Sequence, residues 1–476
     1  MTKDSNDNPQ PDADSSHFTA IEAKMRDVGL SDAAIASFRA NYAALRRNET
    51  GLISESLIEP ADDLPLADTL EASPNAQSHL SKTVVIKLNG GLGTGMGLEK
   101  AKSLLKVKGD NSFLDFIAQQ ILFMRGNTGS NLRFLLMDSF STSTDTLEYL
   151  NDRYPELGEE LDFLQNRVPK IDAATLQPVA VPGNPDLEWC PPGHGDIYAA
   201  LAGSGWLKRL LDAGVLYAFV SNSDNLGATL DLSLLEYFAK SGKPFLMEVT
   251  RRTPSDRKGG HLARFRDGGQ LLLRESAQCP ESDTDTFQDI DRHRYFNTNN
   301  IWFRLDHLQQ ALDANGGFLP LPMIKNNKTA DPRDPDSPAV FQLETAMGAA
   351  IQCFDGAGAI EVGRHRFAPV KTTSDLLVLR SDACVQTPDF RLELAPGRNG
   401  VPPTVNLDGN YKMLDGLEAA LTRAVPSLVE CQSLQVNGPV AFEPNTIFRG
   451  DVVIDNNSGE RKSVPAGSYE DEMLDL

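Results

Sequence analysis

Apolar residues recur at helical spacing between residues 18 and 47 of the 476-residue chain. Ser31 is placed to cap a helix there, because a serine side chain accepts a hydrogen bond from the first turn. One face of that helix is apolar and carries Ile35, Phe38, Tyr42 and Leu45. Residues 59–74 are rich in proline and acidic side chains and predict a linker. The following run at 83–88, TVVIKL, is β-branched and predicts a strand buried on both faces.

Strand-like and helix-like patterns alternate through the middle of the chain. A helix is expected after Leu114, strands at 133–137, 217–221 and 245–250, and helices at 197–211 and 232–239. This alternation predicts an α/β domain with a mostly parallel sheet.

The pattern changes again near the C-terminus, where apolar residues recur every six positions. Turn residues mark the corners between them, which is typical of a β-helix of one or two coils; a pair of hairpins is the alternative. The two apolar series are Leu434, Val440, Thr446 and Val452, and Val436, Phe442, Phe448 and Ile454, with Gly438, Pro444, Gly450 and Asn456 at the corners.

These patterns predict five parts. We expect a disordered acidic tail at 1–16, a helical segment and linker at 17–80, an α/β domain at 81–390, a C-terminal domain with a short β-helix at 391–456, and a flexible acidic tail at 457–476.

Composition narrows the function classes. The net charge of −21 disfavours nucleic acid and anionic membranes as partners. No apolar run reaches the roughly 18 residues that span a bilayer, and the N-terminus lacks a signal-peptide core. Five cysteines without a CxxC pair indicate reduced thiols and a cytoplasmic protein.

Residues 87–103, KLNGGLGTGMGLEKAKS, form the glycine segment. Its five glycines come directly after the predicted buried strand. Glycines let backbone N–H groups approach a phosphate, and Lys102 is placed to return its ammonium to the same anion. A merely tight turn is the alternative. The spacing matches neither a P-loop nor a GxGxxG motif.

Four further segments offer polar chemistry, each with a plainer alternative. His194, in WCPPGHGDIY, is placed to hydrogen-bond a ligand or serves the loop alone. Asp224, at the end of a predicted strand, is a candidate Mg²⁺ ligand or part of an Asx turn. Asn297, Asn299 and Asn300 suit sugar hydroxyls or cap a helix. Lys371, before Thr372, Thr373 and Ser374, clamps a phosphate or opens a helical cap.

The motifs LNGGLGT and MG, PPGHGD, NSDNLGAT, FNTNN, QLETA with GAAI, and PVKTTSDLL stand in this order. Together they resemble the eukaryotic-type UDP-glucose pyrophosphorylase family, over residues 42–455. The resemblance implies the nucleotide-diphospho-sugar transferase fold, which is α/β and Rossmann-like, with a short C-terminal left-handed β-helix. It also implies a Mg²⁺-dependent uridylyltransferase that forms UDP-glucose and pyrophosphate from UTP and glucose 1-phosphate.

The same resemblance implies roles for single residues. Lys102 and Lys371 are the expected catalytic lysines, and Asp224 the expected metal ligand. The expected nucleotide-binding residues are Leu88, Asn89, Gly90, Gly91, Lys102, Gln165, Gly193, Asp224 and Lys371. The expected sugar-phosphate-binding residues are Gly90, Gly91, His194, Asn222, Gly260, Glu275, Asn297 and Asn299.

Three departures from the family pattern are visible. Ala101 replaces a proline before Lys102, Cys190 replaces an aromatic residue, and residues 275–280 read ESAQCP. The proline loss is the one expected to loosen the approach of Lys102.

A homo-oligomer that assembles through the β-helix stays an open expectation.

Three rival functions remain at this point. One is the same chemistry on another sugar 1-phosphate. A second is a nicotinamide-dependent dehydrogenase, which the glycine spacing disfavours. A third is a scaffold or a β-helix acyltransferase, for which the repeat is too short.

Overall fold

The computed structural model describes residues 13–73 and 75–476. Its centre is a ten-stranded mixed sheet in the order β1-β12-β14-β10-β2-β5-β6. Strands β10, β2, β5 and β6 run parallel, whereas β14 is antiparallel to β10. The strands on this path are β1 (Ile58–Pro60), β2 (Thr83–Leu88), β5 (Arg133–Asp138), β6 (Asp162–Leu164), β10 (Tyr217–Asn222), β12 (His261–Phe265) and β14 (Tyr295–Arg304); β11 (Phe245–Arg251), β13 (Leu271–Arg274) and β17 (Gly358–Glu361) pair beside it.

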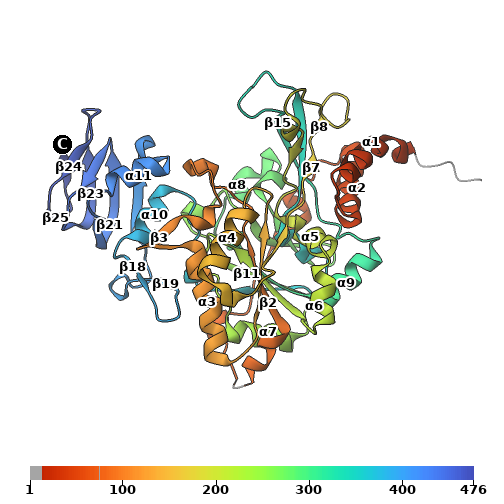
Figure 1. Cartoon of the computed structure of the whole chain (residues 1–476), viewed down its shortest axis with the longest axis horizontal. Coiled ribbons are helices and arrows are strands. Elements are labelled where there is room, and N and C mark those ends of the chain that lie inside the picture. The colour runs from red at the N-terminus through yellow and green to blue at the C-terminus, as the bar shows by residue number, and fades with distance from the viewer. Residues whose placement is uncertain (1–12, 74) are drawn as a thin grey trace, which may run out of the picture.

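Helices cover both faces of this sheet (Figure 1). Strand β2 shows why: Val85 packs into one apolar core, and Val84 and Ile86 pack into the other. Side chains of α3, α4 and α7 fill the first core, and those of α5, α6 and α9 fill the second. The bounds are α3 (Phe113–Thr128), α4 (Ser143–Arg153), α5 (Ile197–Gly203), α6 (Trp206–Asp212), α7 (Leu232–Ser241), α8 (Thr284–Phe287) and α9 (Leu305–Ala314). The predicted strand at 83–88 and the predicted α/β alternation are confirmed.

The N-terminal helices α1 (Ala13–Asp27) and α2 (Asp32–Arg46) pack at one end of the molecule. Ser31 caps α2 as predicted, accepting a hydrogen bond from the Ala34 N–H at 3.2 Å. The expected apolar face is buried. The prediction of a disordered tail at 1–16 falls largely on residues outside the described part, and its last four residues belong to α1. Residues 59–74 are not wholly a linker, because β1 adds a strand to the central sheet.

Smaller strands complete the α/β region. Three of them form a sheet beside the N-terminal helices: β8 (Ile171–Asp172), β15 (Ile324–Thr329) and β16 (Ala339–Glu344). The others pair two by two: β3 (Lys106–Lys108) with β4 (Asn111–Ser112), β7 (Val168–Pro169) with β9 (Trp189–Cys190), and β18 (Cys384–Gln386) with β19 (Leu392–Leu394). The last hairpin straddles residue 390, so the expected domain boundary there cuts a paired unit.

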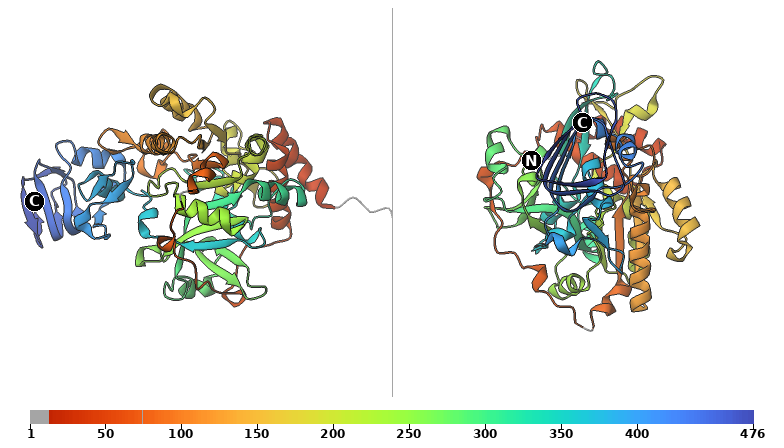
Figure 2. Two further views of the ribbon diagram at one scale, coloured as in Figure 1. Left: turned by 90° about the horizontal axis from the view of Figure 1, so that it is seen from below. Right: turned by 90° about the vertical axis from the view of Figure 1, so that its left-hand side faces the viewer.

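The C-terminal region lies at the opposite end of the molecule from α1 and α2 (Figure 2). Its paired strands all run parallel, β20-β21-β23-β25 with β26 in one sheet and β22-β24 in another. All eight residues of the two six-residue series are buried. The alternative of a pair of hairpins is wrong, because hairpin strands run antiparallel. The bounds are α10 (Thr373–Arg380), β20 (Thr404–Leu407), α11 (Leu414–Ala420), β21 (Ser427–Asn437), β22 (Val440–Phe442), β23 (Thr446–Asp455), β24 (Lys462–Val464), β25 (Gly467–Glu470) and β26 (Met473–Asp475).

The expected flexible tail at 457–476 is instead part of this region. Strand β24 pairs with β22, and β25 and β26 both pair with β23. Their polar side chains face outward, and the backbone ladder, which sequence polarity does not report, holds them in place. No helix in the described part of the chain is long and apolar enough to cross a membrane.

Candidate active site

The candidate site lies where parallel strands β2, β5 and β10 end. Leu88, the last residue of β2, pairs with Asn222, the last residue of β10. The Ser223 N–H then donates to the Leu88 carbonyl at 3.1 Å, which ties the loop after β10 to the start of the glycine segment. Carboxyl ends of parallel strands are where open α/β sheets bind ligands.

The start of the glycine segment is held rigidly. The Asn89 N–H donates to the Met137 carbonyl at 2.8 Å, and the buried Asn89 side chain donates to Asp138 Oδ1 at 2.7 Å. A methyl group on Gly90 would lie 2.7 Å from Gln165 Oε1, so only glycine fits here without displacing that side chain. Gly90 and Gln165, 75 positions apart, are therefore neighbours, as their shared expected role in nucleotide binding requires.

Asp138 was not among the predicted site residues. Its carboxylate accepts hydrogen bonds from Asn89 and from Thr142 Oγ1, at 3.0 Å in the second case. Burial raises the pKa of Asp138 to about 7, and the hydrogen bonds from Asn89 and Thr142 oppose this shift only in part. The Asp138 carboxylate thus orients the side chain of Asn89, which directly precedes Gly90.

This raised pKa predicts a specific pH dependence of stability. Between about pH 4 and pH 7 the folded chain holds the Asp138 proton and the unfolded chain releases it, so the free energy of unfolding falls as pH rises through this window. Asp138→Asn should remove that fall, which amounts to at most about 4 kcal/mol for three pKa units. Urea unfolding at pH 5 and pH 8 measures it. Asp152→Asn, at an exposed position on α4, is the control; parallel profiles for wild type and Asp138→Asn would contradict the assignment.

Lys102 and Asp224 form an ion pair at the centre of the site. The Lys102 Nζ lies 2.6 Å from Asp224 Oδ2 and also donates to the Val370 carbonyl at 2.5 Å. Both side chains are about four-fifths buried, with 16% and 21% exposed. The Val370 N–H donates back to the Asp224 carbonyl at 3.3 Å. The predicted phosphate lysine and the predicted metal ligand therefore meet beside Lys371.

Ala101 adopts a backbone conformation that proline would also allow. Its φ of −50° lies within the range that proline imposes, and the residue is buried. The Lys102 N–H donates to the Gly91 carbonyl at 3.0 Å. The effect of Ala101 on the approach of Lys102 stays a prediction.

The PPGHGD loop is fixed by the QLETA segment. Gly193 has a φ of +79°, and a methyl group there would lie 2.5 Å from the Thr345 carbonyl. The Gly195 N–H donates to that carbonyl at 2.9 Å. His194 Nδ1 accepts from the Met347 N–H at 2.8 Å, so its proton lies on Nε2. Burial lowers the pKa of His194 to about 4, which keeps the ring neutral near pH 7.

Four of the expected sugar-side residues come together, at one end of the β12–β13 hairpin and in β14: Gly260, Glu275, Asn297 and Asn299. A methyl group on Gly260 would lie 2.5 Å from Glu275 Oε2. The Asn297 N–H donates to the Gly260 carbonyl at 3.1 Å, and its side chain donates to Asn299 Oδ1 at 2.9 Å. Asn299 has a φ of +57°. The asparagines lie in strand β14, so the alternative that they cap a helix is wrong.

Lys371 stands between the two halves of the site. Burial raises the pKa of Glu275, while a hydrogen bond from Asn297 and the charge of Lys371 oppose the rise. Lys371 is exposed and directly follows Val370, the partner of Lys102. The helical cap is also present, but the capping residue is Thr372, which exchanges hydrogen bonds with Asp375. Both interpretations of this segment are therefore compatible with the structure.

Protein side chains alone do not make a metal centre here. In the described residues, no group of three histidine, cysteine, aspartate or glutamate side chains could hold a metal ion. Asp224 offers a carboxylate at the site, and Mg²⁺ commonly takes one or two carboxylates and completes its shell with water and substrate phosphates. The residues fit such a shared site.

A strand followed by a rigid glycine segment, two lysines and a cluster of amides defines an α/β protein that binds a phosphorylated nucleotide and a polyol. A family model described as UTP–glucose-1-phosphate uridylyltransferase matches residues 35–449. The UTP–glucose-1-phosphate uridylyltransferase of Saccharomyces cerevisiae is 38% identical over 435 residues, which cover 90% of this chain and 85% of the relative. The chain belongs to this family.

Solved structures agree with the fold. A mutant UDP-glucose pyrophosphorylase from Leishmania major, in complex with UDP-glucose, is 49% identical with a TM-score of 0.92, and covers 97% of this chain and 99% of its own. A UDP-glucose phosphorylase from Trypanosoma brucei is 47% identical with a TM-score of 0.87, and covers 97% of this chain and 100% of its own.

Proposed function

We propose that the chain forms UDP-glucose and pyrophosphate from UTP and glucose 1-phosphate, reversibly. The Lys102–Asp224 ion pair beside Lys371 carries the proposal, because it gathers two ammonium groups and a carboxylate between the glycine segment and the sugar-side amides. On a chain of net charge −21, this local cationic pair is what two phosphorylated substrates require.

The reaction is an in-line displacement at phosphorus. A phosphate oxygen of glucose 1-phosphate forms a bond to the α-phosphorus of UTP, and the bond from that phosphorus to the bridging oxygen breaks as pyrophosphate leaves. Such a transfer needs positioning and charge neutralisation and no nucleophilic side chain. Lys102 and Lys371 neutralise the phosphates as they approach.

The nucleotide is held by backbone and amide groups. Leu88, Asn89, Gly90 and Gly91 border it, and Gln165 reads the uracil edge from its place against Gly90. Gly193 adjoins the base, where its positive φ and its contact with the Thr345 carbonyl leave no room for a side chain.

The sugar phosphate occupies the other half of the site. The neutral His194 offers its Nε2 proton to the phosphate, because Nδ1 is already an acceptor. Asn222, Gly260, Glu275, Asn297 and Asn299 face the glucose hydroxyls. Amide and carboxylate groups suit this task, since they donate to and accept from hydroxyls.

Mg²⁺ is the proposed cofactor, held by Asp224 and the substrate phosphates. When bound, the ion supplies positive charge that offsets the charge on the phosphates. Asp224 would hold the ion through its carboxylate, and Lys102, which lies 2.6 Å from that carboxylate, would neutralise charge on the nucleotide phosphates beside it.

Three finer features belong to the same proposal. The C-terminal parallel strands form a short left-handed β-helix, supported by the buried six-residue series. This region is an oligomer contact. The protein works in the cytoplasm, in keeping with its five free cysteines.

Pyrophosphate release from UTP, Mg²⁺ and one sugar 1-phosphate at a time tests the function. Preference for glucose 1-phosphate and loss of activity with EDTA are expected. Equal turnover of galactose or N-acetylglucosamine 1-phosphate would contradict the sugar assignment. Unchanged activity in EDTA would contradict the metal assignment.

A further inference from the structure

Two expected sugar-side residues flank one pair of residues in the β12–β13 hairpin. His261 pairs with Arg274 across the hairpin. Gly260 directly precedes His261, and Glu275 directly follows Arg274. Any shift of this pair therefore moves the backbone on which both sugar-side residues sit.

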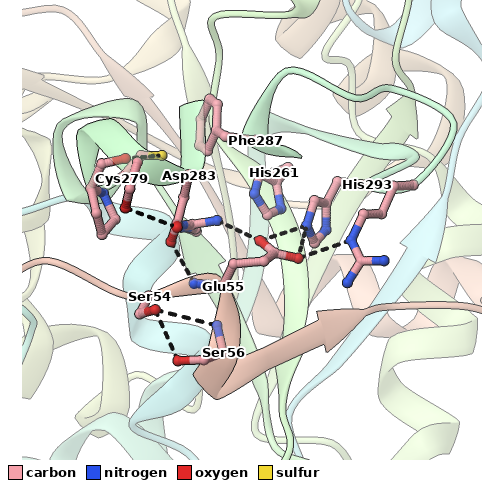
Figure 3. A network of polar contacts seen from close by, with 12 residues as sticks. Ser54, Glu55, Ser56, His261, Cys279, Asp283, Phe287 and His293 are labelled. Carbon is pink, nitrogen blue, oxygen red and sulfur yellow. Dashed lines mark hydrogen bonds and ion pairs between the residues drawn. The ribbon is translucent and has the colours of Figure 1, made fainter. Parts of the chain in front are cut away.

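Glu55, 219 positions before Arg274 in the sequence, holds the same pair. Glu55 accepts hydrogen bonds from Arg274 Nη1 at 2.8 Å and from Arg292 Nε at 2.9 Å, and it lies 3.0 Å from His293 Nε2. The Glu55 N–H donates to Asp283 Oδ2 at 2.7 Å, and Asp283 also pairs with Arg274. These five residues form the Glu55 clasp; Figure 3 shows Glu55 between Asp283 and His293.

The clasp reaches the hairpin through buried groups. Arg274, His261 and His293 are fully buried. The His261 ring stacks on the His293 ring with centroids 3.9 Å apart. In the described part of the chain His261 Nε2 has no hydrogen-bond partner, and the ring is held by Phe287, by His293 and by the Leu262 carbonyl, which lies 3.3 Å from Nδ1. Glu55 holds His293, and thereby the position of His261.

A second connection joins the segment around Glu55 to the turn after Glu275. The Ile53 N–H donates to the Gln278 carbonyl at 2.7 Å. The Gln278 side chain in turn accepts from the Glu275 N–H at 3.0 Å. The segment that carries Glu55 is therefore bonded to the hairpin end at the level of both backbone and side chains.

We propose that Glu55 is a positioning residue for glucose 1-phosphate binding. It acts through the Glu55 clasp, which sets the last residue pair of the β12–β13 hairpin and so the spacing of Gly260, Glu275 and Asn297. The inference rests on the proposed function, because those three residues belong to its sugar side. Among the described residues, those that contact Glu55 lie outside the glycine segment, so we expect the uridine half of the site to be independent of it.

The charge of Glu55 is the essential property. A buried arginine must face carboxylates, and Arg274 has two, Glu55 and Asp283. Removing one negative charge leaves Arg274 undercompensated and lets the hairpin end shift. Gly260 lies so close to the Glu275 carboxylate that a small shift changes the surface offered to the sugar.

The experiment compares Glu55→Gln with Glu59→Gln in the full chain. Glu59 is partly exposed and lies in the same segment, with Arg266 Nη1 at 3.8 Å as its cationic partner. For Glu55→Gln we expect KM for glucose 1-phosphate to rise about tenfold, with kcat and KM for UTP changed by less than about threefold. Glu59→Gln should leave all three parameters at wild-type values.

Arg292→Gln is the second variant, because it removes a more exposed member of the clasp and spares the buried arginine. We expect a smaller rise in the same KM. Equal changes in both KM values, or a lowered melting temperature with unchanged KM values, would overturn the positioning role while wild-type activity upholds the proposed function. A wild-type chain that binds no UDP-glucose in calorimetry and releases no pyrophosphate would overturn both.

Discussion

Lys371→Ala should lower kcat by about 10²–10³, the loss expected when an electrostatic contact of 3–4 kcal/mol to the reacting phosphates disappears. The side chain is exposed, and its neighbourhood contains Glu275 and the Lys102–Val370 contact. Because the Lys371 side chain is exposed and Glu275 keeps its hydrogen bond from Asn297, the free energy of unfolding should change by less than about 0.5 kcal/mol. Steady-state pyrophosphate release and urea unfolding measure the two effects.

The matched control is Lys106→Ala. Lys106 is also exposed, and its ammonium pairs with Asp110 at 2.9 Å. Its removal should leave kcat at the wild-type value. A Lys371→Ala enzyme within threefold of wild type would exclude Lys371 from the mechanism, whereas a large loss of stability would show that its role is structural.

Arg366→Met should destabilise the fold by about 3–5 kcal/mol, because it strands a buried carboxylate. Arg366 and Glu248 form two hydrogen bonds of 2.8 Å, and both side chains are buried. Glu248 also accepts from Trp302 Nε1 at 2.9 Å. Glu248 lies in β11 and Trp302 in β14, so the unpaired Glu248 charge would lie between two strands of the central sheet. Chemical denaturation at neutral pH measures the change.

Arg266→Met makes the same substitution where the side chain is half exposed and the nearest carboxylate, Glu59, is 3.8 Å away. Its effect should stay within about 0.5 kcal/mol. Adding Glu248→Gln to Arg366→Met should recover a large part of the loss, since no uncompensated charge remains. A double variant no more stable than Arg366→Met would contradict the role of the buried charge.

The parts of the fold that follow from local pattern were predictable. The run at 83–88 is β-branched and becomes a buried strand of the central sheet, and Ser31 caps α2, because both depend on neighbouring residues alone. The strands at 462–475 were not predictable, since their polar side chains face solvent and a parallel backbone ladder holds them. Likewise β1 gains its place only from pairing with β12, some 200 residues later.

The candidate site shows the same division. The glycine segment and the strand-end Asp224 stood out by residue type and position, and the family motifs supplied their roles. The ion pair between Lys102 and Asp224 joins residues 122 positions apart, which no local pattern reports. The sequence analysis did not predict Asp138 as a site residue, because nothing local shows that an acidic residue at a strand end is buried. Its partner Asn89 lies 49 positions away, so only the folded structure shows their hydrogen bond.

The Glu55 clasp also sets an order of events during synthesis. Glu55 emerges from the ribosome 238 residues before His293, its partner. At about 5–20 residues per second, translation separates the two by roughly ten to fifty seconds. Until Arg274 is made, 219 residues after Glu55, the nascent chain contains none of the side chains that hold Glu55 in the clasp. The sugar half of the site therefore reaches its final shape only after residue 293 has been made, later than the pairing of β2 with β5 that supports the glycine segment.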